Sequence, residues 1–134
     1  MSKRLRWGLL GGLVLLILVV GGAAALLLAG PPTYSDESVP ITVAPGGDFA
    51  IRLASNATTG YRWELHSAPD SAVVTLRESR YDGPDAPLVG AGGHEVWTFH
   101  AVAPGQTTIG LRYAFQDHAP TRPTQDTVFT VIVR

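Results

Sequence analysis

Short runs of alternating apolar and polar residues constrain the fold of this chain more than any other feature. The alternation runs over residues 48–54, 61–66, 95–102, 107–113 and 126–133. Successive side chains of a strand point to opposite faces of a sheet, so this period predicts half-buried β-strands. After about residue 29 no stretch has helical periodicity, and the predicted domain is therefore all-β.

Two further strands complete the predicted sheets. Residues 39–44 form the first, which we place at a sheet edge because Pro40 cannot donate a ladder hydrogen bond. Residues 72–81 form the other, with Val74 and Leu76 facing inward. About seven short strands separated by turn signals predict an immunoglobulin-like antiparallel β-sandwich over residues 39–134.

The first 30 residues have a different character. Lys3, Arg4 and Arg6 precede a nearly unbroken apolar run that ends near Ala29. A bilayer-spanning helix needs about 20 apolar residues, whereas the apolar part of a secretory signal has about 7–15. The length favours a retained signal-anchor, a transmembrane helix over 1–30 with the C-terminal domain outside the cytoplasm. A cleaved signal peptide is the alternative, and the domain would then be secreted or periplasmic.

A polar, proline-containing stretch over residues 31–38 is predicted to be a linker. If the strands alternate in direction from residue 39 onward, the first strand starts at the same end of the sandwich as the longest loops. A linker of eight residues spans at most about 30 Å. A retained anchor is then expected to hold these loops close to the membrane.

The composition argues against several classes of function. The chain has no cysteine, so disulfides and lipid attachment to cysteine are excluded. Three of the ten basic residues precede the apolar run, and the remaining seven face eleven acids, which gives the exported part a charge of −4. A nucleic-acid-binding protein would need a basic stripe. The four histidines lack metal-ligand spacing and no Gly-x-Ser-x-Gly motif occurs, so we predict no metal, no cofactor, no catalytic residue and no enzyme.

Three connections are longer than the rest, and we name them the first loop (55–60), the second loop (82–94) and the third loop (114–125). In an up-and-down arrangement of strands, alternate connections emerge at the same end. All three loops are therefore predicted to lie together. Loops clustered on a rigid sandwich are a common way to build a recognition surface.

Two of these loops resemble a known family. Residues 56–63 read Asn-Ala-Thr-Thr-Gly-Tyr-Arg-Trp, which resembles the Asn-Pro-Thr-Thr-Gly-Tyr-x-Trp signature of chagasin-type inhibitors of papain-like cysteine proteases. Residues 90–99 read Gly-Ala-Gly-Gly-His-Glu-Val-Trp-Thr-Phe, which is similar to the Gly-x-Gly-Gly loop and Trp-x-Phe strand of that family.

The sequence departs from the family pattern in two places. Ala57 replaces the proline of the signature, so a preset φ angle is lost. The Arg-Pro-Trp motif of the third loop is missing in register, and Phe115, or Arg122 with Pro123, could take its place. The protease-binding residues that the resemblance implies are Asn56, Ala57, Thr58, Thr59, Gly60, Gly90, Ala91, Gly92, Gly93, Phe115, Arg122 and Pro123.

The resemblance implies a monomeric inhibitor domain whose three loops plug the active-site cleft of a papain-like cysteine protease without covalent chemistry. The first loop would approach the catalytic cysteine and histidine, and the glycines would let the second loop run beside the substrate-binding strand. The third loop would pack on an aromatic surface of the enzyme. The alternative is a membrane-anchored, extracytoplasmic immunoglobulin-like module that binds another protein or belongs to the envelope, with no protease target.

Overall fold

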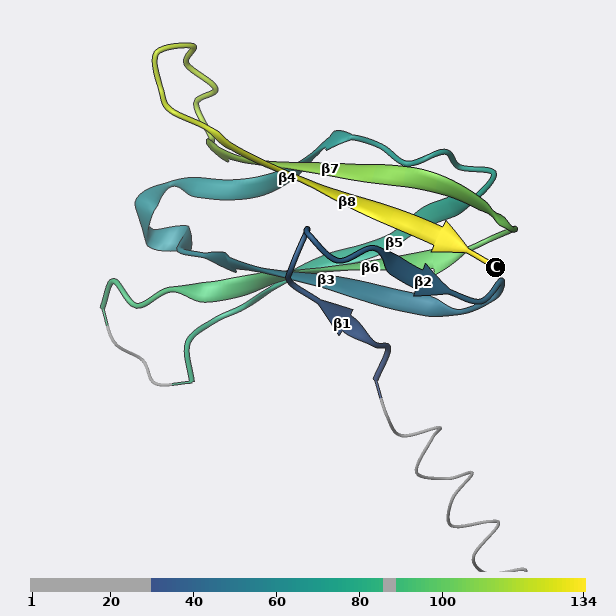
Figure 1. Cartoon of the computed structure of the whole chain (residues 1–134). Helices are drawn as coiled ribbons and strands as arrows, with labels where there is room; N and C mark the ends of the chain where they lie inside the picture. The colour runs from purple at the N-terminus through teal and green to yellow at the C-terminus, as the bar shows by residue number, and fades with distance from the viewer. Residues whose placement is uncertain (1–29, 86–88) are drawn as a thin grey trace, which may run out of the picture. The chain divides into compact units, whose positions relative to one another are not determined.

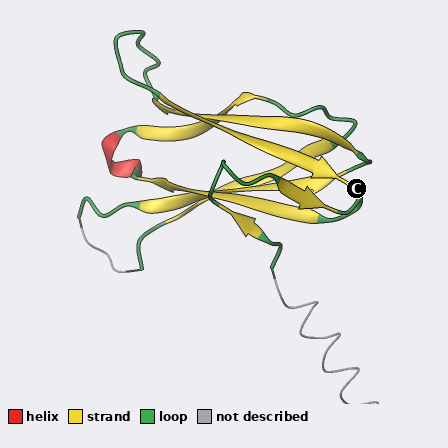
Figure 2. Ribbon diagram, in the orientation of Figure 1, coloured by secondary structure: helices red, strands yellow, loops and turns green. Residues whose placement is uncertain are grey.

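Two four-stranded sheets pack face to face in the computed structural model, which describes residues 30–85 and 89–134 (Figures 1 and 2). One sheet has the strand order β1-β3-β6-β5 and the other has the order β2-β8-β7-β4. The strands are β1 (Thr33–Tyr34), β2 (Ile41–Val43), β3 (Asp48–Ser55), β4 (Tyr61–Ser67), β5 (Val74–Asp82), β6 (Gly93–Ala101), β7 (Gly105–Phe115) and β8 (Gln125–Val133). One short 3-10 helix, η1 (Ala57–Thr59), lies between β3 and β4.

The core lies between the sheets and is built from the inward faces of the alternating strands. Phe49 of β3 stacks on Phe99 of β6 with ring centroids 5.6 Å apart. Apolar residues from both sheets complete this cluster, and most are fully buried, which is the main favourable contribution to folding in a chain without disulfides. The predicted all-β sandwich is thus confirmed.

The structure has eight strands in its described part, one more than predicted. The additional strand is β1, which lies inside the predicted linker and pairs in parallel with β3, with Thr33 opposite Ala50. The N–H of Ala50 donates to the carbonyl of Pro32 at 2.9 Å. A strand of two residues is too short to show a period, and for that reason the sequence pattern did not reveal it.

The sandwich is also not purely antiparallel. β2 pairs in parallel with β8, and Ile41 lies opposite Val131. The predicted first strand is shorter than expected, because Val39 is 53% exposed and lies outside β2. Its place at a sheet edge, inferred from Pro40, is confirmed.

The chain enters the sandwich away from the first loop. β1 runs parallel to β3, and its first residue lies opposite Ala50, five residues before Ser55 at the end of β3. At about 3.3 Å per residue this is about 17 Å along the strand. The first predicted strand, β2, does run away from the loop end, because it is parallel to β8, which starts directly after the third loop. The linker does not start at that end, because β1 precedes β2 and pairs with β3.

One predicted core position is also wrong. Val74 is buried, but Leu76 is 40% exposed although it lies opposite the buried Phe99. β5 is an edge strand, and its register with β6 shifts directly after this residue, between Leu76 and Glu78. A bulge of this kind bends an edge strand.

The predicted N-terminal helix over 1–30 lies outside the described residues except for Gly30. Within the described residues, no helix has the length and apolar character needed to cross a membrane.

Candidate functional site

The first, second and third loops emerge at the same end of the sandwich (Figure 1). They connect β3 to β4, β5 to β6 and β7 to β8, and each pair of strands places its connection at this end. The clustering predicted from the connection lengths is confirmed. Whether the individual residues contact a protease stays a prediction.

The first loop is a capped helical turn. Asn56 is the N-cap of η1, and its Oδ1 accepts hydrogen bonds from the Thr58 N–H at 3.2 Å and the Thr58 hydroxyl at 2.6 Å. The Thr59 hydroxyl donates to the Asn56 carbonyl at 2.7 Å and accepts from the Tyr61 N–H at 3.3 Å. Both threonines are exposed, but each hydroxyl donates its proton to a hydrogen bond within the loop. Toward a partner, these hydroxyls can only accept.

Gly60 ends the turn, and the structure requires glycine there for two reasons. Its φ of 84° is left-handed, a backbone conformation that glycine adopts without strain. A Cβ at this position would lie 2.6 Å from Cε2 of Phe115. The Gly60 carbonyl also accepts from the Gln116 N–H at 3.1 Å, so the first and third loops are joined at this residue.

The glycines of the second loop have different structural roles. Gly90 is exposed with a φ of 79°, and nothing would meet a Cβ there within 4 Å. Gly92 is exposed, and a Cβ would make ordinary contact with the Ser55 carbonyl at 3.4 Å. Gly93 is buried in β6, and a Cβ would lie 2.1 Å from the Asp82 carbonyl. Packing against β5 accounts for Gly93, whereas at Gly92 a Cβ would fit beside Ser55 and Asn56 of the first loop.

A side-chain hydrogen bond ties the second loop to the first. Nδ2 of Asn56 donates to the Gly90 carbonyl at 3.0 Å. The backbone N–H of Asn56 donates to the Tyr113 hydroxyl at 3.0 Å, which fixes the start of the first loop to β7. Tyr113 packs against the core while its hydroxyl reaches the loop.

The three candidate residues of the third loop form one cluster beside the first loop. The Phe115 ring lies edge-on to the Tyr61 ring, with centroids 5.4 Å apart. The Arg122 guanidinium carbon lies over the Phe115 ring, 3.7 Å from its centroid. The Tyr61 hydroxyl donates to the Pro123 carbonyl at 3.2 Å. The sequence offered Phe115 and Arg122 with Pro123 as alternatives, and the structure brings them together.

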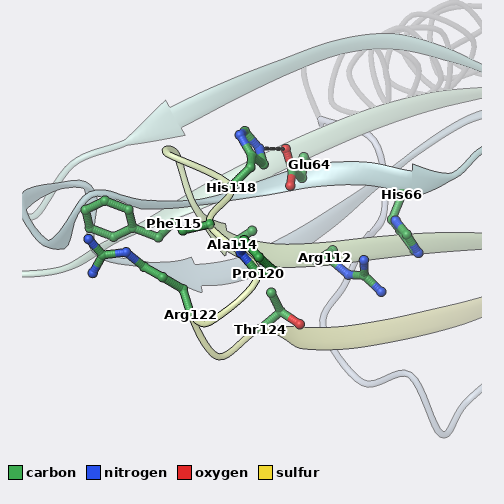
Figure 3. Close-up of a pocket in the computed structure, with 10 residues that line it drawn as sticks. Glu64, His66, Arg112, Ala114, Phe115, His118, Pro120, Arg122 and Thr124 are labelled. Atoms are coloured by element: carbon green, nitrogen blue, oxygen red, sulfur yellow. Dashed lines mark hydrogen bonds and ion pairs between the residues drawn. The ribbon is translucent and has the colours of Figure 1, made fainter.

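A pocket of about 360 Å³ lies between the third loop and the strands β4 and β7 (Figure 3). Its charged side chains are engaged with one another or with neighbours: Nε2 of His118 lies 2.9 Å from Oε2 of Glu64, and Arg112 donates to Asp126 at 2.7 Å. The first pair holds the third loop against β4 and the second joins β7 to β8, and both leave little unpaired charge for a ligand in the pocket. The residues around it are Glu64, His66, Arg112, Ala114, Phe115, His118, Ala119, Pro120, Arg122 and Thr124.

These contacts change the pKa values of two side chains of the third loop, His118 and Asp117. The hydrogen bond and the charge of Glu64 raise the pKa of His118 above its usual value. The N–H of Ala119 and the guanidinium of Arg122, which donates at 2.9 Å, lower the pKa of Asp117. All of these side chains are largely exposed, so solvent weakens the pairs.

Glu95 is a structural residue that the sequence pattern did not single out. It is 7% exposed in β6, and its Oε2 accepts from the Trp63 N–H of β4 at 2.8 Å, so it links the two sheets below the loops. The indole N–H of Trp63 donates to the Ala54 carbonyl at 2.9 Å. An acidic residue on the same strand face as Trp97 and Phe99 is the signal that could have identified it.

The described residues contain no cluster of three or more histidine, aspartate or glutamate side chains that could hold a metal ion. What the loop end presents is a surface of exposed backbone, hydroxyl oxygens and one arginine stacked on an aromatic ring.

Comparison with known proteins decides the family. Residues 42–133 match the model of the chagasin family of peptidase inhibitors, I42. The chain belongs to this family. Chagasin from Trypanosoma cruzi is 34% identical over 85 residues, which cover 60% of this chain and 76% of that protein. The predicted resemblance to chagasin-type inhibitors of papain-like cysteine proteases is confirmed, and the protein is an inhibitor and not an enzyme.

Solved structures show the same fold. The crystal structure of the cysteine protease inhibitor EhICP2 from Entamoeba histolytica has a TM-score of 0.65 at 19% identity, covering 78% of this chain and 100% of that one. The solution structure of amebosin has a TM-score of 0.64 at 24% identity, covering 79% and 100%. PbICP-C, solved in complex with falcipain-2, has a TM-score of 0.55 at 17% identity, covering 79% and 91%. The chagasin-family sandwich is thus shared at low sequence identity.

Proposed function

We propose that this chagasin-family domain inhibits papain-like cysteine proteases by filling their active-site cleft with the first, second and third loops as one non-covalent wedge. The observation that carries the proposal is that hydrogen bonds join all three loops. Asn56 bonds to Gly90 at 3.0 Å, and the Gln116 N–H bonds to the Gly60 carbonyl at 3.1 Å. Surfaces ordered before binding lose less conformational entropy when they bind. This is how an inhibitor without a reactive group can still bind tightly.

The first loop suits the catalytic end of such a cleft. The active cysteine of a papain-like protease is a thiolate paired with histidine, so the site presents an imidazolium donor. Thr58 and Thr59 are exposed and their oxygens are left as acceptors, which matches that donor. The loop is also a closed helical turn, with the Thr59 N–H bonded to Asn56 at 3.1 Å. Its peptide bonds are therefore not held in the extended geometry in which a substrate is attacked.

The second and third loops suit the flanks of the cleft. Gly90, Ala91 and Gly92 offer backbone that can approach a substrate-binding strand closely, because no long side chain holds the two apart. On the other side, the planar Arg122 guanidinium stacked on Phe115 gives a flat cationic surface that can pack on an aromatic ring of the enzyme.

Inhibition of papain and cathepsin L by the full chain, purified in a mild non-ionic detergent, tests the proposal. We expect a dissociation constant in the nanomolar range or below, and Gly92→Arg should raise it at least about 100-fold, because its long charged side chain would start beside Ser55 and Asn56, where the first and second loops meet. The fold should persist, since a Cβ at Gly92 meets only ordinary contacts. Gln106 is an exposed residue of β7 near the β6–β7 turn, at the opposite end of the sandwich. Gln106→Arg adds the same charge there and should leave the dissociation constant unchanged.

No inhibition by the unmodified chain at micromolar concentration would overturn the proposal and favour a protein-binding module without a protease target. Equal effects of Gly92→Arg and Gln106→Arg would also overturn it, because the loop end would then not be the contact surface.

We further propose that residues 1–30 are a retained transmembrane anchor, with the inhibitor domain outside the cytoplasm. The proposal is supported by the length of the apolar run and by the basic residues before it. The entry of the chain through β1, about 17 Å along β3 from the first loop, removes the reason to expect the loops to be held closest to the membrane. Full-length protein in the membrane fraction is the expected result, and a shortened soluble product would instead show cleavage.

A further inference from the structure

One side chain, that of Asn56, performs two tasks at the loop end. Its Oδ1 accepts from the N–H and hydroxyl of Thr58, which caps the first loop, and its Nδ2 donates to the carbonyl of Gly90 in the second loop. The orientation of the amide follows from its partners, because a backbone N–H can only donate and a carbonyl can only accept. The capping task and the linking task therefore belong to different atoms.

The backbone of Asn56 is itself held in place. Its N–H donates to the Tyr113 hydroxyl at 3.0 Å, and the ring of Tyr113 packs on the core and against Trp63 at 5.1 Å between centroids. The link to Gly90 thus runs from the core of the sandwich, through Asn56, to an exposed loop residue with a left-handed backbone. The residues joined by this link are 34 positions apart in the chain.

We propose that Asn56 is a positioning residue that sets the spacing between the first and second loops, and that it acts through Gly90 rather than by touching the protease. The effect on inhibition rests on the proposed function, but the link itself is a property of the inhibitor alone. A net hydrogen bond of this kind changes an equilibrium by about 2- to 12-fold. Its loss should raise the inhibition constant by that factor, because the second loop must then be ordered during binding.

Asn56→Asp separates the two tasks. Aspartate keeps the oxygen that accepts from Thr58 and is as good an N-cap as asparagine. It replaces the donor with an oxygen that faces the Gly90 carbonyl, so only the link is lost. Thr58→Val is the matched opposite variant, because it removes the hydroxyl that bonds to Asn56 and leaves Nδ2 in place. Asn56→Ala removes both tasks.

Hydrogen exchange of the full chain in detergent, measured by mass spectrometry, reads the two loops separately. Asn56→Asp should accelerate exchange at residues 89–93 by about 2- to 12-fold and leave residues 58–60 unchanged, and the loss of one hydrogen bond should lower the melting temperature by at most about 12 °C. Thr58→Val should accelerate residues 58–60 alone. The inhibition constant of Asn56→Asp for papain, measured well below the melting temperature, should rise by a similar factor.

Unchanged exchange at residues 89–93 in Asn56→Asp would overturn the proposal, as would faster exchange there with an unchanged inhibition constant. If the natural chain does not inhibit papain, the proposed function fails, and the exchange measurements still decide whether Asn56 holds the second loop.

Discussion

Replacing Ala57 by proline should stiffen the first loop and stabilise the domain. Ala57 is the first residue of η1, and Asn56 before it has an extended backbone with φ −122° and ψ 96°. This position favours proline, because the fixed φ of proline suits the start of a helix. The N–H that proline lacks would have no partner within the helix at this position. The residue before a proline must be extended, and Asn56 already is.

The size of the effect follows from the unfolded chain. A proline that fits the native backbone stabilises a protein by about 0.4–1 kcal/mol, because the unfolded state has fewer conformations to lose. For a domain of about 100 residues, 1 kcal/mol raises the melting temperature by about 4–8 °C. The first loop is already held by the bonds of Asn56 and Thr59, so any gain in affinity should be smaller than the about 2- to 5-fold that the same energy would give.

Thermal unfolding of the full chain, followed by tryptophan fluorescence, measures the melting temperature. Titration of papain measures the affinity. Ala57→Gly is the matched control, because it adds conformational freedom at the same position and should lower the melting temperature. A lower melting temperature or weaker inhibition in Ala57→Pro would refute the reasoning, since it would mean that the backbone at residue 57 cannot accept a proline.

Three further outcomes follow from single contacts. Gly60→Ala should cost about 1–3 kcal/mol in urea unfolding, because of its left-handed φ and the nearby aromatic ring. Glu95→Ala should cost about 1–3 kcal/mol by leaving the Trp63 N–H without its buried acceptor, whereas Glu95→Gln keeps an oxygen there and should cost less. The contact with Glu64 raises the pKa of His118. Its stabilisation should be present below the unfolded pKa of histidine and lost as the pH rises through the folded value. An NMR titration should show a lower His118 pKa in Glu64→Gln.

The strands and the loop end could be predicted from the sequence because both depend on local pattern. Alternation identified the long strands, and the lengths of the connections placed three loops at one end, which requires only that neighbouring strands reverse direction. Gly60 was predictable for the same reason, since a glycine after a short polar run indicates an unusual backbone angle.

The contacts that hold the loops together could not be predicted, because they join residues far apart in the chain. Nothing local at Asn56 indicates a partner at Gly90, and nothing at Glu95 indicates the backbone of Trp63. β1 was not predicted, because a strand of two residues shows no period. Its parallel pairing with β3 also depends on the chain passing through β2 of the other sheet before it returns as β3. Such pairings are set by the packing of the whole sandwich.

The third loop differs from the family pattern in what its aromatic residue does. Phe115 is half-buried, with Tyr61 at its edge, Arg122 over its ring and Gly60 close enough to exclude a side chain. The ring is therefore occupied in holding the third loop to the first. Arg122 and Pro123 are the exposed residues of this cluster, and a guanidinium gives less apolar contact area than a tryptophan. We therefore expect the first and second loops to supply most of the binding energy, with the third loop serving chiefly to hold the first in place.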